Sequence, residues 1–354
     1  MTATWPTILV TTWADGLFAL AGQASRQEWP GTSVRGLARD ASGNALAIVG
    51  GKSLCRRTPE GAWHTIAKSD LELGCCVAVG ANIYVGRDDA AQVLRVCDDG
   101  SLEPLAGFDH VSGRDQWYAG TALIDGRHVG PPLGIRSMAA TCDGKALLAN
   151  VHVGGIPRSI DGGLTWQPTI EVDSDVHQVC AHPTRPEIVA AATGIGLAIS
   201  RDGGRSWTTE CKGLHAAYCS AVAFADDNIL VAASTDHFAS QGAIYRRPID
   251  GAGLLKPVGA GLPRWIEGIA DTGNIAASGS TLAMADRAGN LYLSDDTGRT
   301  WSRHGNQFPT PSSVFICQDG MLQLPVEGIR DFAHRVVVQP RNEHQDQGTA
   351  EDRE

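Results

Sequence analysis

The sequence lacks several features that mark common classes of protein. No apolar run approaches the ~20 residues that a membrane-spanning helix needs. The first twenty residues carry no basic segment, and Trp13 and Asp15 interrupt their apolar stretch, so we expect no secretory signal. No long stretch shows the 3.6-residue apolar period of a surface helix. These absences argue against a helical membrane protein and against a helical bundle.

Basic residues are too few to give the chain a positive face. The 29 Lys and Arg residues are outnumbered by 39 Asp and Glu residues, which gives a formal net charge of −10 without a basic stripe. Nucleic acids and anionic membranes attract positive surfaces. We therefore expect neither as a partner, and the sequence does not indicate an oligomeric state.

The cysteines form no recognisable metal or redox motif. There are nine, an odd number, with no C-x-x-C pair, and Cys75 and Cys76 are adjacent. Most lie in apolar stretches, such as those around Cys180 and Cys317. Reduced thiols in a core are typical of cytoplasmic proteins, so we expect a cytoplasmic location.

The abundant residues predict short strands joined by tight turns. Glycine occurs 42 times, and short runs of Val, Ile, Leu, Ala, Thr and Trp alternate with turn residues. Three segments, 159–166, 200–207 and 294–301, share the pattern S-x-D-x-G-x-[ST]-W. In such a turn the Asp caps backbone amides, the Gly adopts a positive φ and the Trp packs between neighbouring sheets.

This pattern resembles the Asp-box, or BNR repeat, of a β-propeller family that includes sialidases, sortilin-type ectodomains and photosystem assembly factors. The resemblance implies an all-β fold built from four-stranded blades. Asp161 and Asp202 are 41 residues apart, and Asp296 lies 94 residues further on, which are about one and two blade lengths. We expect these three Asp residues to be structural and not catalytic.

Extending the blade along the chain predicts a seven-bladed propeller, with six or eight blades as the alternatives. Inner strands are expected at 34–39, 75–79, 135–140, 176–181, 219–223 and 266–271. The N-terminus supplies three strands without an inner one, and 313–317 is expected to close the ring with them, which removes free sheet edges. We expect one domain over 1–340, with an extra strand or helix in 321–340, and a disordered tail over 341–354.

Aligning the inner strands brings one position into a common column. It is occupied by Arg35, Cys75, Arg136, His177, Ser220, Glu267 and Val314. Because side chains alternate along a strand, this column is expected to face the mouth of the central channel, where the inner strands begin. Charged groups in such a ring need partners or solvent, so the ring either binds a ligand or is a solvated set of salt bridges.

Three histidines from successive blades are expected near this mouth. His152 and His237 lie in loops between second and third strands, and His177 begins an inner strand. With the carboxylate of Glu267 or Asp236, they form a set for a divalent Zn, Mn, Fe, Ni or Cu ion. The alternative is three unrelated loop histidines, since no local ligand motif accompanies them.

The link over 109–134 is much longer than the others. Loops of this length in a compact fold are usually functional or disordered, so we expect a lid over the mouth. An ordered surface loop or a subunit contact is the alternative.

These residues favour a metal-dependent lyase or hydrolase that acts on a small anionic substrate. Arg35, Arg87 and Arg136, with Trp117 of the long link, would bind the anion. The metal would act as a Lewis acid or activate water. The residues expected to move the proton are Glu267, Tyr218 and His215.

Two other functions stay open. A non-catalytic binding or assembly module would show an exposed aromatic or apolar face. A sialidase-type glycosidase is disfavoured, because that family's pattern has an N-terminal F-R-I-P-like segment, three arginines and a Tyr-Glu pair. The nearest string here, Gly-Ile-Pro-Arg at 155–158, lies in mid-chain and does not match.

Overall fold

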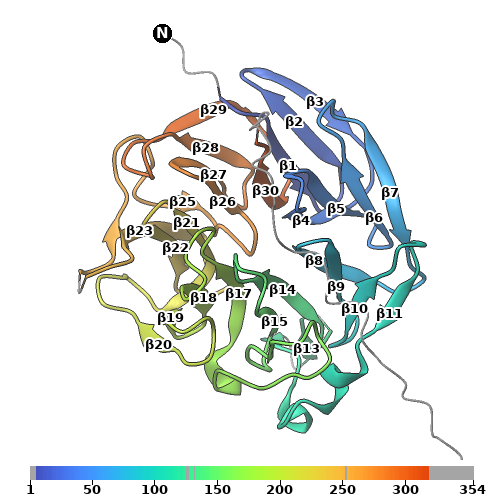
Figure 1. Ribbon diagram of the computed structural model, residues 1–354. Coiled ribbons are helices and arrows are strands. Elements are labelled where there is room, and N and C mark those ends of the chain that lie inside the picture. The colour runs from blue at the N-terminus through green and yellow to red at the C-terminus, as the bar shows by residue number, and fades with distance from the viewer. Residues whose placement is uncertain (1–4, 121, 125–126, 131, 252, 319–354) are drawn as a thin grey trace, which may run out of the picture. The chain divides into compact units, whose positions relative to one another are not determined.

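A computed structural model describes residues 5–318, except 121, 125, 126, 131 and 252. These residues form small antiparallel sheets arranged as a seven-bladed β-propeller (Figure 1). The all-β, seven-bladed prediction is therefore confirmed. The predicted boundary at 340, the element expected in 321–340 and the tail over 341–354 lie outside the described residues.

Each blade runs from an inner strand to an outer one. From inside out, the strands of blades one to three are β30 (Pro311–Ile316), β1 (Ile8–Thr12), β2 (Leu17–Ala21) and β3 (Ala24–Glu28); β4 (Val34–Arg39), β5 (Ala45–Val49), β6 (Ser53–Arg57) and β7 (Trp63–Lys68); and β8 (Leu73–Val79), β9 (Asn82–Arg87), β10 (Val93–Val96) and β11 (Leu102–Pro104).

Blades four to seven follow the same order. Their strands are β14 (Ile135–Ala140), β15 (Leu147–Val151) and β16 (Arg158–Ser159); β17 (Val176–Ala181), β18 (Val189–Thr193), β19 (Gly196–Ser200) and β20 (Thr208–Glu210); β21 (Tyr218–Ala225), β22 (Asn228–Ser234), β23 (Gln241–Pro248) and β24 (Lys256–Pro257); and β26 (Ile275–Ser278), β27 (Thr281–Ala285), β28 (Asn290–Ser294) and β29 (Ser302–Gln307). In blade four, an isolated bridge between Arg158 and Gln167 takes the place of the outer strand.

The cores lie between neighbouring blades, and strand alternation divides side chains between them. Along β18, Ala190 and Ala192 belong to the core shared with blade six, whereas Val189 and Ala191 belong to the core shared with blade four. Every residue of this strand is buried, because both faces of the blade are covered. Such strands read as continuous apolar runs, as this one does.

The three S-x-D-x-G-x-[ST]-W segments form turns after the third strands, at the end of the blades opposite the mouth. In the first, Asp161 Oδ1 accepts the Thr165 N–H at 2.9 Å, and its Oδ2 accepts the Thr165 hydroxyl at 2.6 Å. Gly163 has φ +92°, and the Trp166 indole N–H donates to its carbonyl oxygen at 2.9 Å. The carboxylates therefore cap their own turns, as expected.

Strands from both ends of the described chain close the ring in blade one. β30 pairs antiparallel with β1, which continues into β2 and β3 (Figure 1). The Thr11 and Ser313 hydroxyls lie 2.8 Å apart across this pair. The predicted closing strand at 313–317 is thus confirmed, with its start two residues earlier.

One predicted inner strand is wrong. Residues Ile266–Glu267 form β25, which pairs with β23 of blade six, and the inner strand of blade seven is β26. Gly268 (φ +75°) ends β25, and its N–H donates to the Ser240 carbonyl oxygen at 2.8 Å. Glu267 is therefore not part of the central column.

Six inner strands, β4, β8, β14, β17, β21 and β30, contain a β-bulge or register shift. In β17 the pairing shifts between Val176 and Gln178, so that His177 is the extra residue, and the corresponding residue of β14 is Arg136. A bulge leaves its extra residue unpaired and re-aims the side chain. In β8, β21 and β30 the extra residues are Gly74, Ser220 and Ser312. The side-chain column at the mouth is thus set by bulges as well as by alternation.

Candidate functional site

Two histidines and an aspartate from blades four and five form a compact cluster at the mouth. His152 follows β15, Asp175 directly precedes β17, and His177 is the second residue of β17. Their ligand atoms all lie within 4.8 Å of one another. The His152 Nε2–Asp175 Oδ1 and His177 Nε2–Asp175 Oδ2 distances are 3.2 and 3.3 Å. Ligand atoms ~2.1 Å from one ion and at right angles lie about 3 Å apart, so these separations suit a metal site.

The tautomer of His177 is set by the backbone of blade six. Its Nδ1 lies 2.6 Å from the carbonyl oxygen of Cys219, which only accepts, so Nδ1 carries the proton. In the neutral ring, Nε2 then presents a lone pair to the Asp175 carboxylate. This Nε2 has no hydrogen-bond partner among the described residues, and His177 is 1% exposed. A lone pair buried against a carboxylate needs a cation between them, either a proton or a metal ion.

His152 is held by the long link. A Cβ at Gly120 would lie 2.2 Å from His152 Cε1, so the backbone of this glycine packs directly against the imidazole. The amide of Tyr118 donates to the Val153 carbonyl oxygen at 3.1 Å, which ties the link to the loop that carries His152. Burial lowers the pKa of His152, with Arg136 acting in the same direction, so the ring is neutral at neutral pH.

Asp175 has an unusual backbone conformation. It follows the short helix η3 (Val172–Ser174) with φ +50°, which Asp tolerates better than most residues. Burial alone would raise the pKa of Asp175, but the imidazoles of His152 and His177 hold it well below its usual range. The cluster thus offers an ionised carboxylate and at least one neutral imidazole, the protonation states that a metal ion binds.

Blades four, six and seven add further polar groups around the cluster. Arg136 Nη1 lies 3.0 Å from His152 Nε2, and its Nη2 lies 3.8 Å from Asp271. Arg287, in the loop after β27, reaches the other oxygen of Asp271 at 4.0 Å. The Tyr218 ring packs on His177 with centroids 4.4 Å apart, and burial raises the pKa of its phenol, which stays protonated. The mouth therefore combines two guanidinium groups with one nearby carboxylate.

The predicted trio of metal-binding histidines is only partly brought together. His152 and His177 meet, but His237 is absent from the one group of candidate ligands found in the described residues. Its ring lies edge-on to Phe238 with centroids 5.1 Å apart. Asp175 is the third member of that group, and neither Glu267 nor Asp236 belongs to it.

Two of the expected catalytic residues lie elsewhere. Glu267 is exposed on β25 and pairs with Gln241 of β23. His215 Nδ1 lies 2.8 Å from the Tyr245 hydroxyl, and its ring contacts the edge of Trp265. Neither side chain contacts the cluster, whereas Tyr218 does.

Of the expected anion-binding residues, only Arg136 lies at the cluster. Arg35 donates to the Leu73 carbonyl oxygen and pairs with Asp88 at 3.0 Å. Arg87 forms two 2.9 Å bonds with Asp89 in its own loop. Their positive charges are therefore already compensated.

Trp117 belongs to the core and not to a binding surface. It is 7% exposed and packs on Phe108 with ring centroids 5.7 Å apart. The described part of the link contains the short helices η1 (Ala106–His110) and η2 (Arg114–Gln116) and the ribbon of β12 (Ala122–Ile124) and β13 (Arg127–Val129). The described part of the link is thus structured, and its Gly120 packs against His152.

Asp175, Asp271 and Arg287 were missed by the sequence reasoning. Asp175 directly precedes the inner strand predicted at 176–181, at the mouth where His177 lies, and this position in the sequence was a usable signal. Asp271 was assigned to an inner strand that does not form. Arg287 lies in the loop between the second and third strands of its blade. The prediction of His152 and His237 rested on loops of this same kind.

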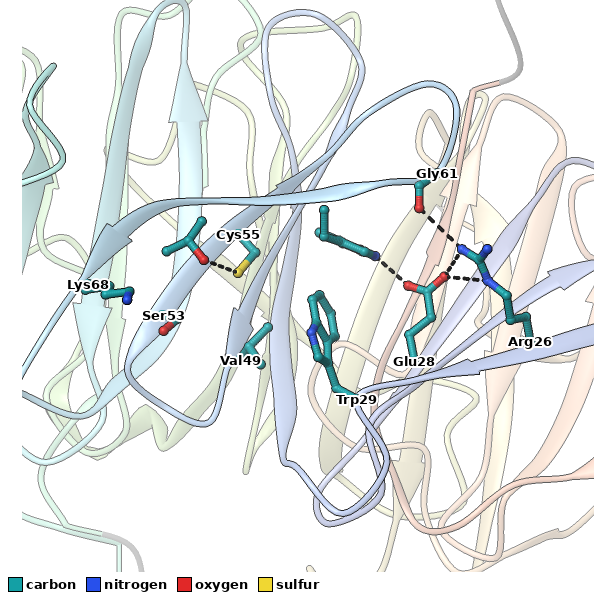
Figure 2. Close-up of a pocket in the computed structure, with 10 residues that line it drawn as sticks. Arg26, Glu28, Trp29, Val49, Ser53, Cys55, Gly61 and Lys68 are labelled. Carbon is teal, nitrogen blue, oxygen red and sulfur yellow. Dashed lines mark hydrogen bonds and ion pairs between the residues drawn. The ribbon is translucent and has the colours of Figure 1, made fainter.

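One cavity lies away from this cluster. About 430 Å³ in volume, it lies between the outer strands of blades one and two (Figure 2). Glu28 is held there by Arg26 and by the Trp63 indole N–H, and the Cys55 thiol lies 3.6 Å from the Thr65 hydroxyl. Because most of its polar groups pair with one another, we interpret it as a gap in inter-blade packing. The buried unpartnered atoms make the mouth the better candidate.

Among the described residues, no helix has the length and apolar character required to cross a bilayer.

No family model and no curated protein matches the chain. Solved propellers are similar in fold. Virginiamycin B lyase from Staphylococcus aureus is 11% identical with a TM-score of 0.53, over 78% of this chain and 85% of that one. A putative 6-phosphogluconolactonase from Bacteroides fragilis is 16% identical with a TM-score of 0.51, over 89% and 98%. A GH74 enzyme from Niastella koreensis is 14% identical with a TM-score of 0.50, over 85% of this chain but 43% of its own. At these identities the likeness shows the propeller fold alone.

Proposed function

We propose that this protein is a metal-dependent enzyme, a lyase or hydrolase, that acts on a small anionic substrate at the mouth of the propeller. His152, Asp175 and His177 would hold the divalent ion. The observation that carries this proposal is the buried Nε2 of His177, which makes no hydrogen bond to any described residue and faces the Asp175 carboxylate at 3.3 Å. Its Nδ1–H donates to a backbone carbonyl oxygen, as metal-binding histidines usually do.

The ligand set suits a first-row transition metal. Two imidazoles and one carboxylate leave coordination positions open, as in Zn, Fe and Mn enzymes. A bound ion would supply Lewis-acid polarisation or an activated water. Arg136 and Arg287 would bind the anionic group, and the phenol of Tyr218 would donate a proton.

The fold neighbours support catalysis only by analogy. Two of them are named as a lyase and a putative lactonase, so the fold hosts enzymes, but fold does not determine function. We also propose membership of the Asp-box family, supported by the hydrogen bonding of the three turns. A cytoplasmic location is supported by core thiols such as Cys76, whose pKa burial raises to about 12.

Metal content tests the proposal directly. Plasma mass spectrometry of the purified, untagged protein should find near-stoichiometric metal in the wild type and little in His177→Ala. His304→Ala is the matched control, because His304 is also buried but both its ring nitrogens are paired, with the Gly22 carbonyl and the Asn306 amide. Metal absent from folded wild-type protein, even after incubation with Mn²⁺ or Zn²⁺, would refute the proposal.

A second candidate function is non-catalytic binding of a protein partner. Four aromatic side chains are 39–63% exposed, and topology places all of them toward the mouth: Trp13, Tyr118, Phe238 and Trp265. This is the exposed aromatic face expected of a binding module.

Cross-linking tests the second candidate. A partner captured by the wild type should be lost from a Trp13→Ser/Phe238→Ser double variant. It should be kept by Ile160→Ser/Leu164→Ser, in which exposed apolar residues at the opposite end of blade four are changed. Equal capture by both variants would reject this face as the binding surface.

A further inference from the structure

Arg136 differs from its counterpart two blades earlier. Arg35 and Arg136 are both the second residue of an inner strand, β4 and β14. Arg35 pairs with Asp88 at 3.0 Å. The nearest polar partner of Arg136 is an imidazole nitrogen, His152 Nε2 at 3.0 Å, and its carboxylate partner Asp271 is 3.8 Å away.

The contact between Arg136 and His152 occupies the lone pair that a metal ion would need. A guanidinium group only donates hydrogen bonds, so His152 Nε2 accepts from Arg136. The same nitrogen lies 3.2 Å from Asp175 Oδ1, as expected for a ligand of the shared ion. Arg136 and a divalent cation therefore compete for one nitrogen atom.

Asp271 offers Arg136 a second position. Its Oδ1 lies 3.8 Å from Arg136, and its Oδ2 lies 4.0 Å from Arg287. If Arg136 leaves His152, its guanidinium group therefore needs only a short movement to pair with the Asp271 carboxylate. Two guanidinium groups would then share one carboxylate, which leaves one positive charge uncompensated. Planar guanidinium groups bind carboxylates and tetrahedral oxyanions with two parallel hydrogen bonds.

We propose that a divalent cation at His152, Asp175 and His177 displaces Arg136 from His152, and that the released guanidinium, together with Arg287, binds an oxyanion of the substrate. The inference rests on the proposed metal site and adds the residue that recognises the substrate. The metal and the anion then bind with positive coupling, and each raises the affinity for the other by the same factor.

The test measures Mn²⁺ binding to wild type, Arg136→Gln and Arg35→Gln by calorimetry. Circular dichroism first checks that each of the three proteins is folded. Mn²⁺ alone should bind about tenfold more tightly to Arg136→Gln than to wild type, because the competing cation is gone. Arg35→Gln, at the same strand position but paired with Asp88, should bind like wild type. Mn²⁺ affinity that is equal or lower in Arg136→Gln would overturn the inference.

Anions provide the second readout. At constant ionic strength, replacing chloride by acetate or sulfate should tighten Mn²⁺ binding to wild type at least fivefold, and should have no effect on Arg136→Gln. A response to acetate alone would assign the site to carboxylates, and a response to sulfate alone to tetrahedral oxyanions. An anion effect that persists in Arg136→Gln would contradict the role of Arg136. If neither wild type nor Arg136→Gln binds Mn²⁺, the proposed metal site itself is wrong. If both bind Mn²⁺ with the same affinity, the metal site stands and only the role of Arg136 is wrong.

Discussion

Among single residues, the glycine at position 120 shapes the mouth as directly as the histidine that it covers. Its missing side chain leaves room for the His152 ring, since a Cβ there would lie 2.2–2.8 Å from three ring atoms. Gly120 does not have a positive φ, so space and not backbone conformation requires a glycine. The long link therefore contacts the cluster of His152, Asp175 and His177 directly at this glycine.

Gly120→Ala should weaken metal binding about 10- to 100-fold, the range typical for changes beside a ligand, because the added methyl group must push the His152 ring out of place. Calorimetric titration with Mn²⁺ measures the effect. Gly259→Ala is the control, since no atom lies within 4 Å of a Cβ at that position. Unchanged affinity in Gly120→Ala would show that the link moves instead of the ring, and that it does not position His152.

The Asp175→Asn variant distinguishes two interpretations of the contact between His177 and Asp175, a metal site and a structural ion pair. Asn tolerates the positive φ of this position, and its amide can donate to the His177 Nε2 lone pair. At a metal site, the variant should lose its metal while the metal-free protein becomes more stable by about 1 kcal/mol. Urea unfolding in the presence of a chelator measures this. A clear loss of stability would show instead that a proton joins His177 to Asp175.

At the scale of elements, the S-x-D-x-G-x-[ST]-W turns hold the ends of the third strands by hydrogen bonds within the turn. The Asp202 carboxylate accepts the Ser206 amide at 2.9 Å and its hydroxyl at 2.7 Å. Burial opposes ionisation, but these hydrogen bonds outweigh it and lower the pKa of Asp202 to about 2. Because the folded-state pKa is depressed, the ionised turn stabilises the fold above the unfolded pKa near 4, and this contribution disappears as the pH falls toward 2.

Asp202→Asn should therefore lower the free energy of unfolding at pH 7 by about 1 kcal/mol, a value reduced by the partial solvent exposure of the turn. The difference from wild type should vanish near pH 2. Urea unfolding between pH 2 and pH 7 measures both. Asp295→Asn, at an exposed Asp without turn bonds in the described structure, should have no such effect. A pH-independent difference would mean that the charge is not what stabilises the turn.

The strands were more predictable than the site because strands are encoded locally. The bounds of β4, β14 and β17 agree with the inner strands predicted at 34–39, 135–140 and 176–181. No local pattern showed that Ile266–Glu267 would join blade six, since that depends on the edge of β23. The bulges that re-aim Arg136 and His177 also depend on pairing with the next strand. His152 and His177 were predicted as site residues from the sequence. The place of Asp271 beside Arg136 and Arg287 became visible only once the ring of blades was known.

At the scale of the whole molecule, the mouth exists only in the closed ring. His152 comes from blade four, Asp175 and His177 from blade five, Tyr218 from blade six, and Asp271 and Arg287 from blade seven. No blade holds more than two members of this set. The strand that closes the ring, β30, is therefore expected to support the site although it contributes no residue to it.

A chain ending at Thr310, which lacks β30, should fail to fold, whereas one ending at Gln318, which keeps β30, should unfold in a cooperative transition. β30 buries Val314, Phe315 and Ile316, which together contribute roughly 5–9 kcal/mol. This approaches the whole stability of a typical domain, about 5–15 kcal/mol, and its loss also exposes the edge of β1. Calorimetry and gel filtration compare the two chains. A cooperative transition in the shorter chain would show that six blades are stable without closure.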